Sequence, residues 1–266
     1  MIELPRSRAL LNVLSLVDDE AGELPVEKQF LRDLKASVEM TDAKNQRKPS
    51  KTFKPSSLHC IRNMYFQVMG APISEDSASC ELIGICESGT DRHERIQQYV
   101  CDMKSNNIDC EYVDVAEYVR QHNLGYLDVV SKNGYETKLF YKDLNMRFLC
   151  DGIIRYKGRY YILEIKTETA NKFWDRKGVN PDHILQGTAY SLAFGIEDVL
   201  FVYECRDNCS KKAFMLHVTD DMRDALRQKI FNCMGYISRQ IVPPKPEDVS
   251  RKMCAYCGYA DICKRS

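Results

Sequence analysis

The segment YYILEIKTET, residues 160–169, is the feature that most constrains the fold. Its apolar and aromatic residues predict a buried β-strand, yet Glu164 and Lys166 stand two positions apart near its end. Residues 148–154 form a second strand pattern just upstream. Because a charge in a buried strand is costly unless it is paired, these charges either face solvent or are held in the sheet for chemistry.

A tight turn between the two segments determines how they pair. Lys157-Gly158 has the composition of a two-residue loop, and such a loop favours a β-hairpin in which Tyr156 pairs with Arg159. In that register Asp151 lies directly opposite Glu164, with the two β-carbons about 5 Å apart. The sequence therefore predicts two facing carboxylates on neighbouring strands.

Facing carboxylates repel each other unless a positive charge lies between them. A divalent ion is the natural candidate, since the hard oxygen ligands of Asp151 and Glu164 suit Mg²⁺ or Mn²⁺. Side chains alternate along a strand, so Lys166 shares the face of Glu164 and could orient a water molecule. The alternative is a surface pair of carboxylates that Lys166 neutralises.

The remaining pattern predicts a mixed sheet flanked by helices. Strands are expected at residues 138–141, 148–154, 160–166, 199–204 and 213–218. Helices are expected from Ser56–Ser57 to Gly70, after Gly89-Thr90, and at residues 114–123, 182–194 and 220–240. Residues 71–88 are expected to form a loop.

Length and composition suit one large domain with additions, because the chain has 266 residues and a 44% apolar fraction. We expect residues 1–50 to form an N-terminal extension with a basic linker. Residues 51–266 would form the main domain, including a Cys-rich C-terminal segment, 250–266. The sequence has neither a run of eighteen apolar residues nor a signal-peptide pattern, so we expect no membrane contact and an intracellular location.

The net charge of zero gives no general argument for nucleic acid, but the linker is locally basic. Between Thr41 and Ser56, one acidic residue stands against five basic ones: Lys44, Arg47, Lys48, Lys51 and Lys54. This run is either a solvated tether or an arm that contacts phosphates.

Four short elements occur in order along the chain: GTDRHE at 89–94, DG at 151–152, EIK at 164–166, and Gln186 with Tyr190 four residues later. Together they resemble the PD-(D/E)XK nuclease superfamily, especially its RecB-like branch, in which the "PD" element is often reduced to "DG". Cys150 here replaces the proline. The resemblance implies a restriction-endonuclease-like α/β fold, with a mixed β-sheet core flanked by α-helices.

The resemblance also implies roles for single residues. The implied ligands of the catalytic metal are His93, Asp151, Glu164 and the carbonyl of Ile165. Lys166 would be the catalytic lysine. Gln186 and Tyr190 match the QxxxY element, which supports the active site and contacts DNA in that family.

Twelve cysteines in a chain without a secretion signal should be thiols or metal ligands rather than disulfides. Cys254, Cys257 and Cys263 form a C-x₂-C-x₅-C pattern, which leaves a four-thiolate site one ligand short. In iron–sulfur members of the RecB-like branch, such as the small CRISPR-associated exonucleases and the AddB nuclease domain, the fourth cysteine lies far upstream. The similar placement of Cys60 suggests a [4Fe–4S] cluster, although spacing alone does not separate it from Zn²⁺.

These expectations favour a Mg²⁺- or Mn²⁺-dependent DNA exonuclease that acts on single strands or DNA ends in recombination, repair or replication, with protein partners from those processes. A CRISPR spacer-acquisition nuclease is one alternative. A non-catalytic DNA-binding module of RecB-like fold in a larger assembly is another. A redox or radical enzyme is disfavoured, because the four proposed cysteines leave no open iron site.

Overall fold

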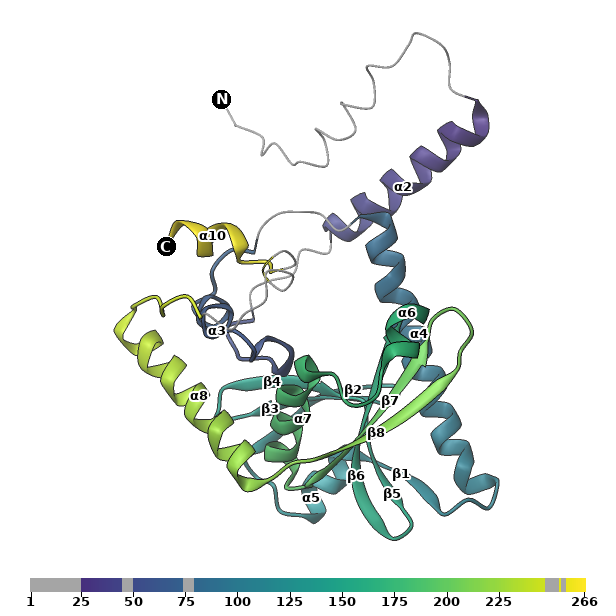
Figure 1. The fold of residues 1–266 in the computed structure, drawn as a ribbon, viewed down its shortest axis with the longest axis vertical. Helices are drawn as coiled ribbons and strands as arrows, with labels where there is room; N and C mark the ends of the chain where they lie inside the picture. Colours follow the sequence, from purple (N-terminus) through teal and green to yellow (C-terminus); the bar gives the residue numbers. More distant parts are fainter. Residues whose placement is uncertain (1–24, 45–49, 74–78, 247–253, 255–256) are drawn as a thin grey trace.

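A computed structural model of the chain describes residues 25–44, 50–73, 79–246, 254 and 257–266. Its strands are β1 (Cys110–Val113), β2 (Leu127–Asn133), β3 (Glu136–Tyr141), β4 (Met146–Cys150), β5 (Gly152–Tyr156), β6 (Arg159–Glu168), β7 (Asp198–Cys205) and β8 (Lys211–His217). Its helices are α2 (Val26–Lys44), the 3₁₀ turn η1 (Pro55–Ser57), α3 (Ile61–Val68), α4 (Cys80–Ser105), α5 (Val115–Gln121), α6 (Ala170–Asp175), α7 (Pro181–Phe194), α8 (Asp220–Arg239) and α10 (Ala260–Arg265). Figure 1 shows their arrangement.

The central element is a five-stranded mixed sheet in the order β1-β5-β6-β7-β8. Strands β6 and β7 are parallel and the other neighbours are antiparallel. Parallel neighbours need a long crossover, and the chain supplies it with α6 and α7. A second sheet, β2-β3-β4, continues from β4 into β5 through Asp151. The expected fold class, a mixed sheet flanked by helices, is therefore confirmed.

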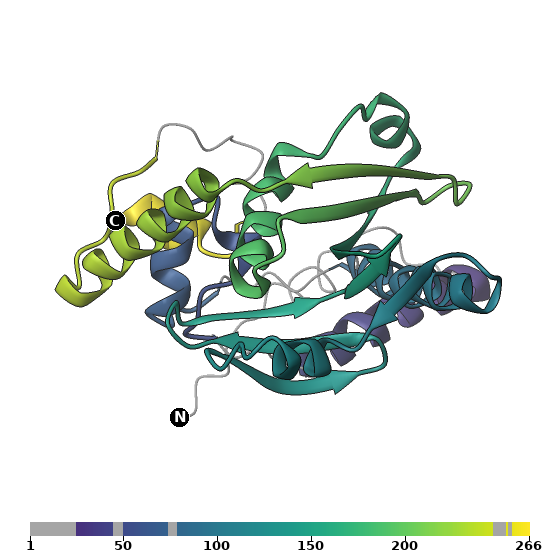
Figure 2. The same cartoon turned by 90° about the horizontal axis from the view of Figure 1, so that it is seen from below.

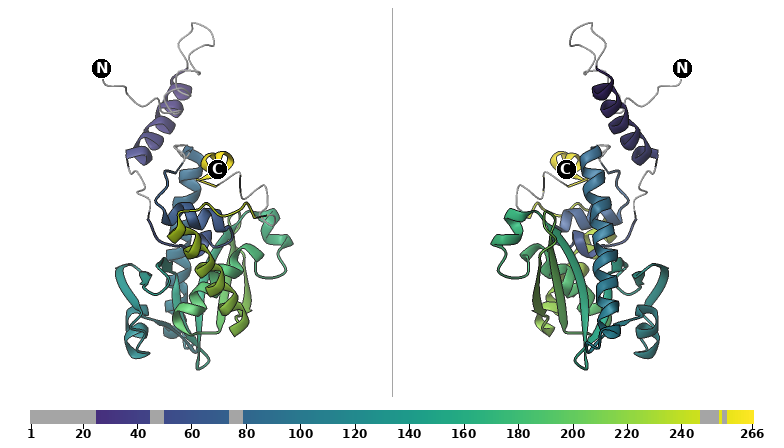
Figure 3. Two further views of the ribbon diagram at one scale, coloured as in Figure 1. Left: turned by 90° about the vertical axis from the view of Figure 1, so that its left-hand side faces the viewer. Right: turned by 90° about the vertical axis from the view of Figure 1, so that its right-hand side faces the viewer.

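The two faces of the central sheet carry different helices (Figures 2 and 3). Leu163 and Ile165 of β6 pack with Ile96 of α4 in one buried cluster. Ile162 belongs to the other cluster, which also holds Ala189 of α7. Because side chains alternate along β6, Glu164 and Lys166 lie on the α7 face.

Two helices begin at different residues from those expected. Residues 55–57 form only the 3₁₀ turn, and α3 starts at Ile61 with Cys60 as its N-cap, so the predicted start at Ser56–Ser57 is wrong. The predicted loop 71–88 is also wrong in its second half, since α4 already starts at Cys80. Ser79 caps that helix, because its side chain accepts a hydrogen bond from the N–H of Leu82.

Helix α2 stands apart from the sheets (Figures 1 and 3). It is attached to the start of α4 by Lys35–Glu81, at 2.6 Å, and by Glu39, which accepts a hydrogen bond from the N–H of Cys80. Residues 1–24 of the expected extension, and Arg47 and Lys48 of the basic run, lie outside the described residues. Within the described ranges, no helix is both long and apolar enough to cross a membrane.

Candidate functional site

The hairpin of β5 and β6 forms in the predicted register. Tyr156 pairs with Arg159, and pairing continues to Gly152 opposite Leu163. The turn residues Lys157 and Gly158 both have positive φ, 49° and 78°, as a type I′ turn requires. Asp151 is thus the next residue along the strand, at the break between the two sheets.

Four neighbours fix Asp151, which is 6% exposed. Its Oδ2 accepts a hydrogen bond of 2.7 Å from the N–H of Ile165, and its Oδ1 lies 3.3 Å from Nδ1 of His93. Its backbone carbonyl accepts hydrogen bonds from Gln97, at 2.7 Å, and from the hydroxyl of Tyr112, at 2.5 Å. His93 and Gln97 are four residues apart on α4, so one helix face holds both ends of Asp151.

Gly152 allows this arrangement because Tyr112 packs directly over its backbone. A β-carbon at position 152 would lie 2.6 Å from the Tyr112 ring. Any larger residue would therefore displace the ring whose hydroxyl holds the carbonyl of Asp151. The glycine of the "DG" element thus has a local packing role in this fold.

The second carboxylate, Glu164, forms a compact group with Lys166 and Gln186. Its Oε1 accepts hydrogen bonds from Nζ of Lys166 at 2.6 Å and from Nε2 of Gln186 at 2.7 Å. Its Oε2 is buried and has no hydrogen-bond partner among the described residues. Burial raises the pKa of Glu164 to about 7, although Lys166 acts in the opposite direction. Burial alone would lower the pKa of Lys166, but the ion pair with Glu164 outweighs it and the pKa is raised.

Tyr190 supports this group from beneath. Its hydroxyl accepts a hydrogen bond from Gln186 at 2.7 Å and donates one to the carbonyl of Leu149 on β4 at 3.1 Å. The ring is only 3% exposed. A base cannot stack on a buried ring, so the expected direct contact of Tyr190 with nucleic acid is wrong for this conformation. Tyr190 instead orients Gln186.

A third carboxylate, Glu136, was absent from the sequence expectations. Its ligand atom and those of His93 and Asp151 all lie within 4.8 Å of one another, and this group does not include Glu164. On β3 and β4, Thr137 pairs with Cys150, and one further step of that register places Glu136 beside Asp151. The signal for it was Gly134, the first residue of the two-residue turn Gly134-Tyr135 that leads into the strand of Glu136.

These residues suit a divalent cation. An imidazole and two carboxylates are ligands that Mn²⁺ and Mg²⁺ accept. Burial and then the charge of Asp151 raise the pKa of Glu136, and the opposing effect of His93 is smaller. Of the predicted ligands, His93 and Asp151 lie in this group together with Glu136, whereas Glu164 lies outside it and its Oε2 has no hydrogen-bond partner among the described residues.

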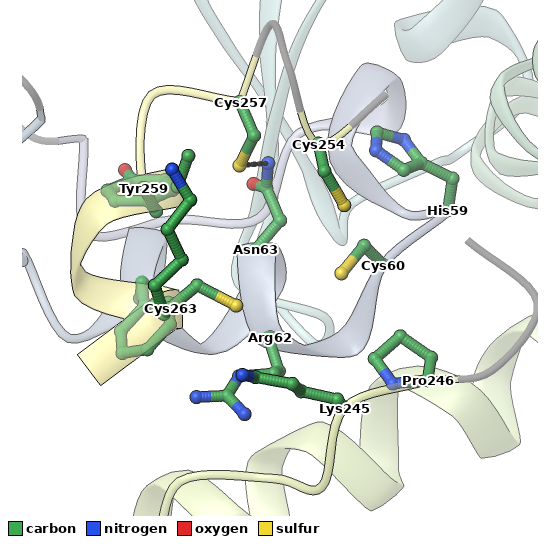
Figure 4. A pocket seen from close by; sticks show the side chains of 13 residues that line it. His59, Cys60, Arg62, Asn63, Lys245, Pro246, Cys254, Cys257, Tyr259 and Cys263 are labelled. Carbon is green, nitrogen blue, oxygen red and sulfur yellow. Dashed lines mark hydrogen bonds between the residues drawn. The ribbon is translucent and has the colours of Figure 1, made fainter. Parts of the chain in front are cut away.

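A second candidate site lies between α3 and the C-terminal segment (Figure 4). A cavity of about 240 Å³ is lined by Cys60, Cys254, Cys257 and Cys263, whose sulfurs point toward a shared space. Nδ2 of Asn63 lies 3.4 Å from Sγ of Cys257. The structure thus places the distant Cys60 with the three C-terminal cysteines.

The spacing of these sulfurs bears on which group they could hold. Tetrahedral zinc, with bonds of about 2.3 Å, would hold its sulfurs about 3.8 Å apart. Among the described residues, His93, Glu136 and Asp151 form the only group of three or more ligand atoms that lie within 4.8 Å of one another. No three of the four cysteine sulfurs are therefore that close together. In a [4Fe–4S] cluster each cysteine ligates a different iron, so the four cysteine sulfurs lie further apart than around one zinc ion. Three cations also line the cavity and suit an anionic group: Arg62, Lys245 and Lys264.

No family model and no curated protein matches this chain. Among solved structures, one described as SSO0001 is 16% identical with a TM-score of 0.47, over 89% of this chain and 97% of that one. The alkaline exonuclease LHK-Exo from Laribacter hongkongensis is 13% identical with a TM-score of 0.45, over 72% and 90%. LHK-Exo in complex with dAMP gives 10% and 0.44, over the same shares. Likeness at this level does not identify the chemistry, which rests on the residues described above.

Proposed function

We propose that this chain is a metal-dependent nuclease that hydrolyses phosphodiester bonds in DNA, acting as an exonuclease on single strands or ends. The observation that carries the proposal is that two groups meet where Asp151 accepts a hydrogen bond from the N–H of Ile165. One is the cluster of His93, Glu136 and Asp151, and the other is the buried pair of Glu164 and Lys166. Residues 51–266 would form the nuclease unit and residues 1–50 an extension.

Four side chains would bind the catalytic metal ion. A bound Mg²⁺ or Mn²⁺ would supply Lewis acidity toward the scissile phosphate. His93, Glu136 and Asp151 would hold it, and Glu164 would add its free Oε2. Ile165 contributes its N–H, which orients Asp151.

Lys166 acts through its charge. Because the ion pair with Glu164 raises the pKa of Lys166, the ammonium group keeps its protons near neutral pH. It is therefore suited to orient the attacking water and to stabilise negative charge that develops on the phosphate, rather than to remove a proton. Gln186 holds Glu164 in place for this role.

The cysteine cavity would bind a [4Fe–4S] cluster through Cys60, Cys254, Cys257 and Cys263, with zinc as the less suitable occupant. Phosphodiester hydrolysis requires no electron transfer, so the cluster would be structural. It would join the C-terminal segment to the start of α3, where the ring of Tyr259 already packs 6.0 Å from that of Phe66.

The test is nuclease activity of the purified protein on single-stranded and duplex DNA, with Mg²⁺, with Mn²⁺ and with EDTA. We expect cutting that EDTA abolishes, and a Lys166→Ala variant that is slower by about 100- to 1,000-fold. Lys104→Ala, at a lysine that is 65% exposed, is the control and should cut at the parent rate. Lys166→Ala cutting at the parent rate would remove the assignment. DNA binding without cutting under any of these conditions would instead favour a non-catalytic module.

A further inference from the structure

The one tryptophan of the chain, Trp174, has an exposed side chain. It lies on α6, the helix that directly follows β6, the strand of Glu164 and Lys166. The side chain is 57% exposed. An indole is a large apolar group, and a stably exposed one is a candidate contact surface. The question is whether its setting favours nucleic acid.

The ring is held rigidly. Phe173, 1% exposed, packs its ring against that of Trp174 at 5.0 Å and 81°. Nζ of Lys212 lies 5.5 Å from the indole and donates hydrogen bonds to the backbone carbonyls of Phe173, Trp174 and Arg176 at 2.7, 3.2 and 3.2 Å. A platform fixed in advance loses little entropy when a flat partner stacks on it.

The same anchoring connects α6 to the catalytic strand. Arg176 forms an ion pair with the buried Glu168 and lies 4.4 Å above the ring of Tyr203. Tyr203 is the partner of Lys166 across the parallel pair of β6 and β7. Arg176 of the segment after α6 and Tyr203 of β7 therefore link this helix to the proposed catalytic lysine.

The turn between β7 and β8 connects the start of α6 to the helix that carries His93, a proposed metal ligand. The N–H of Ala170, the first residue of α6, donates to Asp207 in the turn between β7 and β8 at 3.2 Å. Arg92, adjacent to His93, donates to the carbonyl of Arg206 in that turn at 2.9 Å.

The charge of the surroundings suits a phosphate backbone. Lys172 and Lys177 flank Trp174 on exposed positions, and Lys211 is exposed on the neighbouring hairpin. The carboxylates of Glu168 and Glu204 are buried in ion pairs. The exposed acidic residues of α6 and of the turn between β7 and β8 are then Asp175 and Asp207. Proteins that bind single strands combine such lysines with an aromatic platform.

The geometry points to Trp174 as a stacking platform for a nucleobase of single-stranded DNA whose backbone enters the proposed active site. This inference rests on the proposed function for the identity of the ligand. It adds a substrate-contacting residue outside the motifs of the sequence, and it assigns to α6 the base contact that the buried Tyr190 cannot make.

The single tryptophan is its own reporter. In the Lys166→Ala background, which prevents cutting, a single-stranded oligodeoxythymidylate should quench the tryptophan emission in a saturable way. Binding of the same labelled oligonucleotide, measured by anisotropy, should weaken roughly tenfold or more in Trp174→Ala. Trp174→Phe should retain most of the affinity, because phenylalanine also offers a flat ring. Phe231→Ala, which removes a 52% exposed ring on α8, is the matched control and should bind as the parent does.

Circular dichroism of each variant shows whether it folds, and if Trp174→Ala does not, the quenching titration still decides. The inference would be overturned if a folded Trp174→Ala variant bound the oligonucleotide with unchanged affinity. It would also be overturned if the tryptophan emission stayed constant while anisotropy showed that the oligonucleotide was bound. Parent protein that cuts DNA while its emission ignores the oligonucleotide would do so as well, and would leave the nuclease proposal intact. Saturable quenching without metal-dependent cutting would support the platform and remove the nuclease proposal.

Discussion

The carboxylate of Asp151 accepts a hydrogen bond of 2.7 Å from the backbone N–H of Ile165, so the break between the two sheets is joined to the middle of β6. This bond leaves Oδ1 directed at His93. An asparagine at this position could still accept the bond from Ile165 but would carry no charge. We therefore expect Asp151→Asn to fold as the parent does while losing metal-dependent cutting by about 100-fold or more. Initial rates against Mn²⁺ concentration, with circular dichroism of each variant, provide the check. Parent rates at equal metal concentration would contradict it.

The buried state of Glu164 predicts a pH dependence of stability in metal-free protein. Its pKa is raised by burial to about 7, from an ordinary value of 4.5. The folded state therefore holds the proton more tightly, so the contribution of Glu164 is complete below about pH 4.5 and is lost as pH rises through about 7. In EDTA, the free energy of unfolding of the parent should fall relative to that of Glu164→Gln across this range.

Urea unfolding of both proteins between about pH 5 and pH 7.5 measures that difference. Taking the difference removes the contribution of groups common to both proteins. Glu94→Gln, at an exposed position on α4, should instead follow the parent at every pH. A constant difference between the parent and Glu164→Gln would contradict the prediction.

Glu136 should contribute directly to metal affinity, since its carboxylate lies within 4.8 Å of the ligand atoms of His93 and Asp151. Glu136→Gln retains the shape of the side chain and removes the charge. We expect Mn²⁺ binding, measured by calorimetry without DNA, to weaken about tenfold or more. Glu87→Gln, at an exposed position nearer the start of α4, provides the control. Equal affinity in Glu136→Gln would restrict its role to packing beside Asp151.

The contrast between Glu164 and Glu136 shows how far the sequence could predict the site. Glu164 was placed opposite Asp151 because Lys157-Gly158 leaves only two residues in the turn, which determines the register directly. The register that brings in Glu136 runs through a four-residue connection, 142–145, between Tyr141 and Met146, where several turn types are possible. Alternation along the strand could place Lys166 on the face of Glu164, but only the structure shows that their ion pair is buried rather than exposed to solvent.

The start of α4 was missed for a different reason. Gly84 and Gly89 each lower helix propensity by about 1 kcal/mol relative to alanine, so the residues after Ser79 resemble a loop. The helix nevertheless continues through both glycines. Its second half packs on the sheet through Ile96, and its start contacts α2 through the ion pair of Glu81 with Lys35. Tertiary contacts thus overrode the local preference.

Replacement of Gly152 should damage both stability and the site. A β-carbon there would lie 2.6 Å from the ring of Tyr112, so Gly152→Ala must displace the ring that holds the carbonyl of Asp151. We expect a loss of about 1–3 kcal/mol in the free energy of unfolding. Adding Tyr112→Ala should recover part of the loss by making room. Gly235→Ala, on α8 with only Arg239 within 4 Å at 3.9 Å, should be neutral or slightly stabilising. Equal stability of Gly152→Ala and the parent would show that the ring moves without cost.

The cysteine cavity can be tested with two cysteines that lie close together but differ in their surroundings. Cys60 caps α3 and lines the cavity, whereas Cys233 of α8 is fully buried, with its thiol directed at the carbonyl of Ile61 at 3.7 Å. Burial raises the pKa of Cys233 to about 12, which keeps its thiol protonated and unsuited to bind a metal. We expect anaerobically purified parent and Cys233→Ala to contain iron and sulfide and to absorb broadly in the visible range. Cys60→Ala should lose the iron and unfold at a lower temperature, because the C-terminal segment would no longer be joined to α3. Colourless parent protein carrying one zinc ion would contradict the cluster, and iron retained in Cys60→Ala would exclude Cys60 as a ligand.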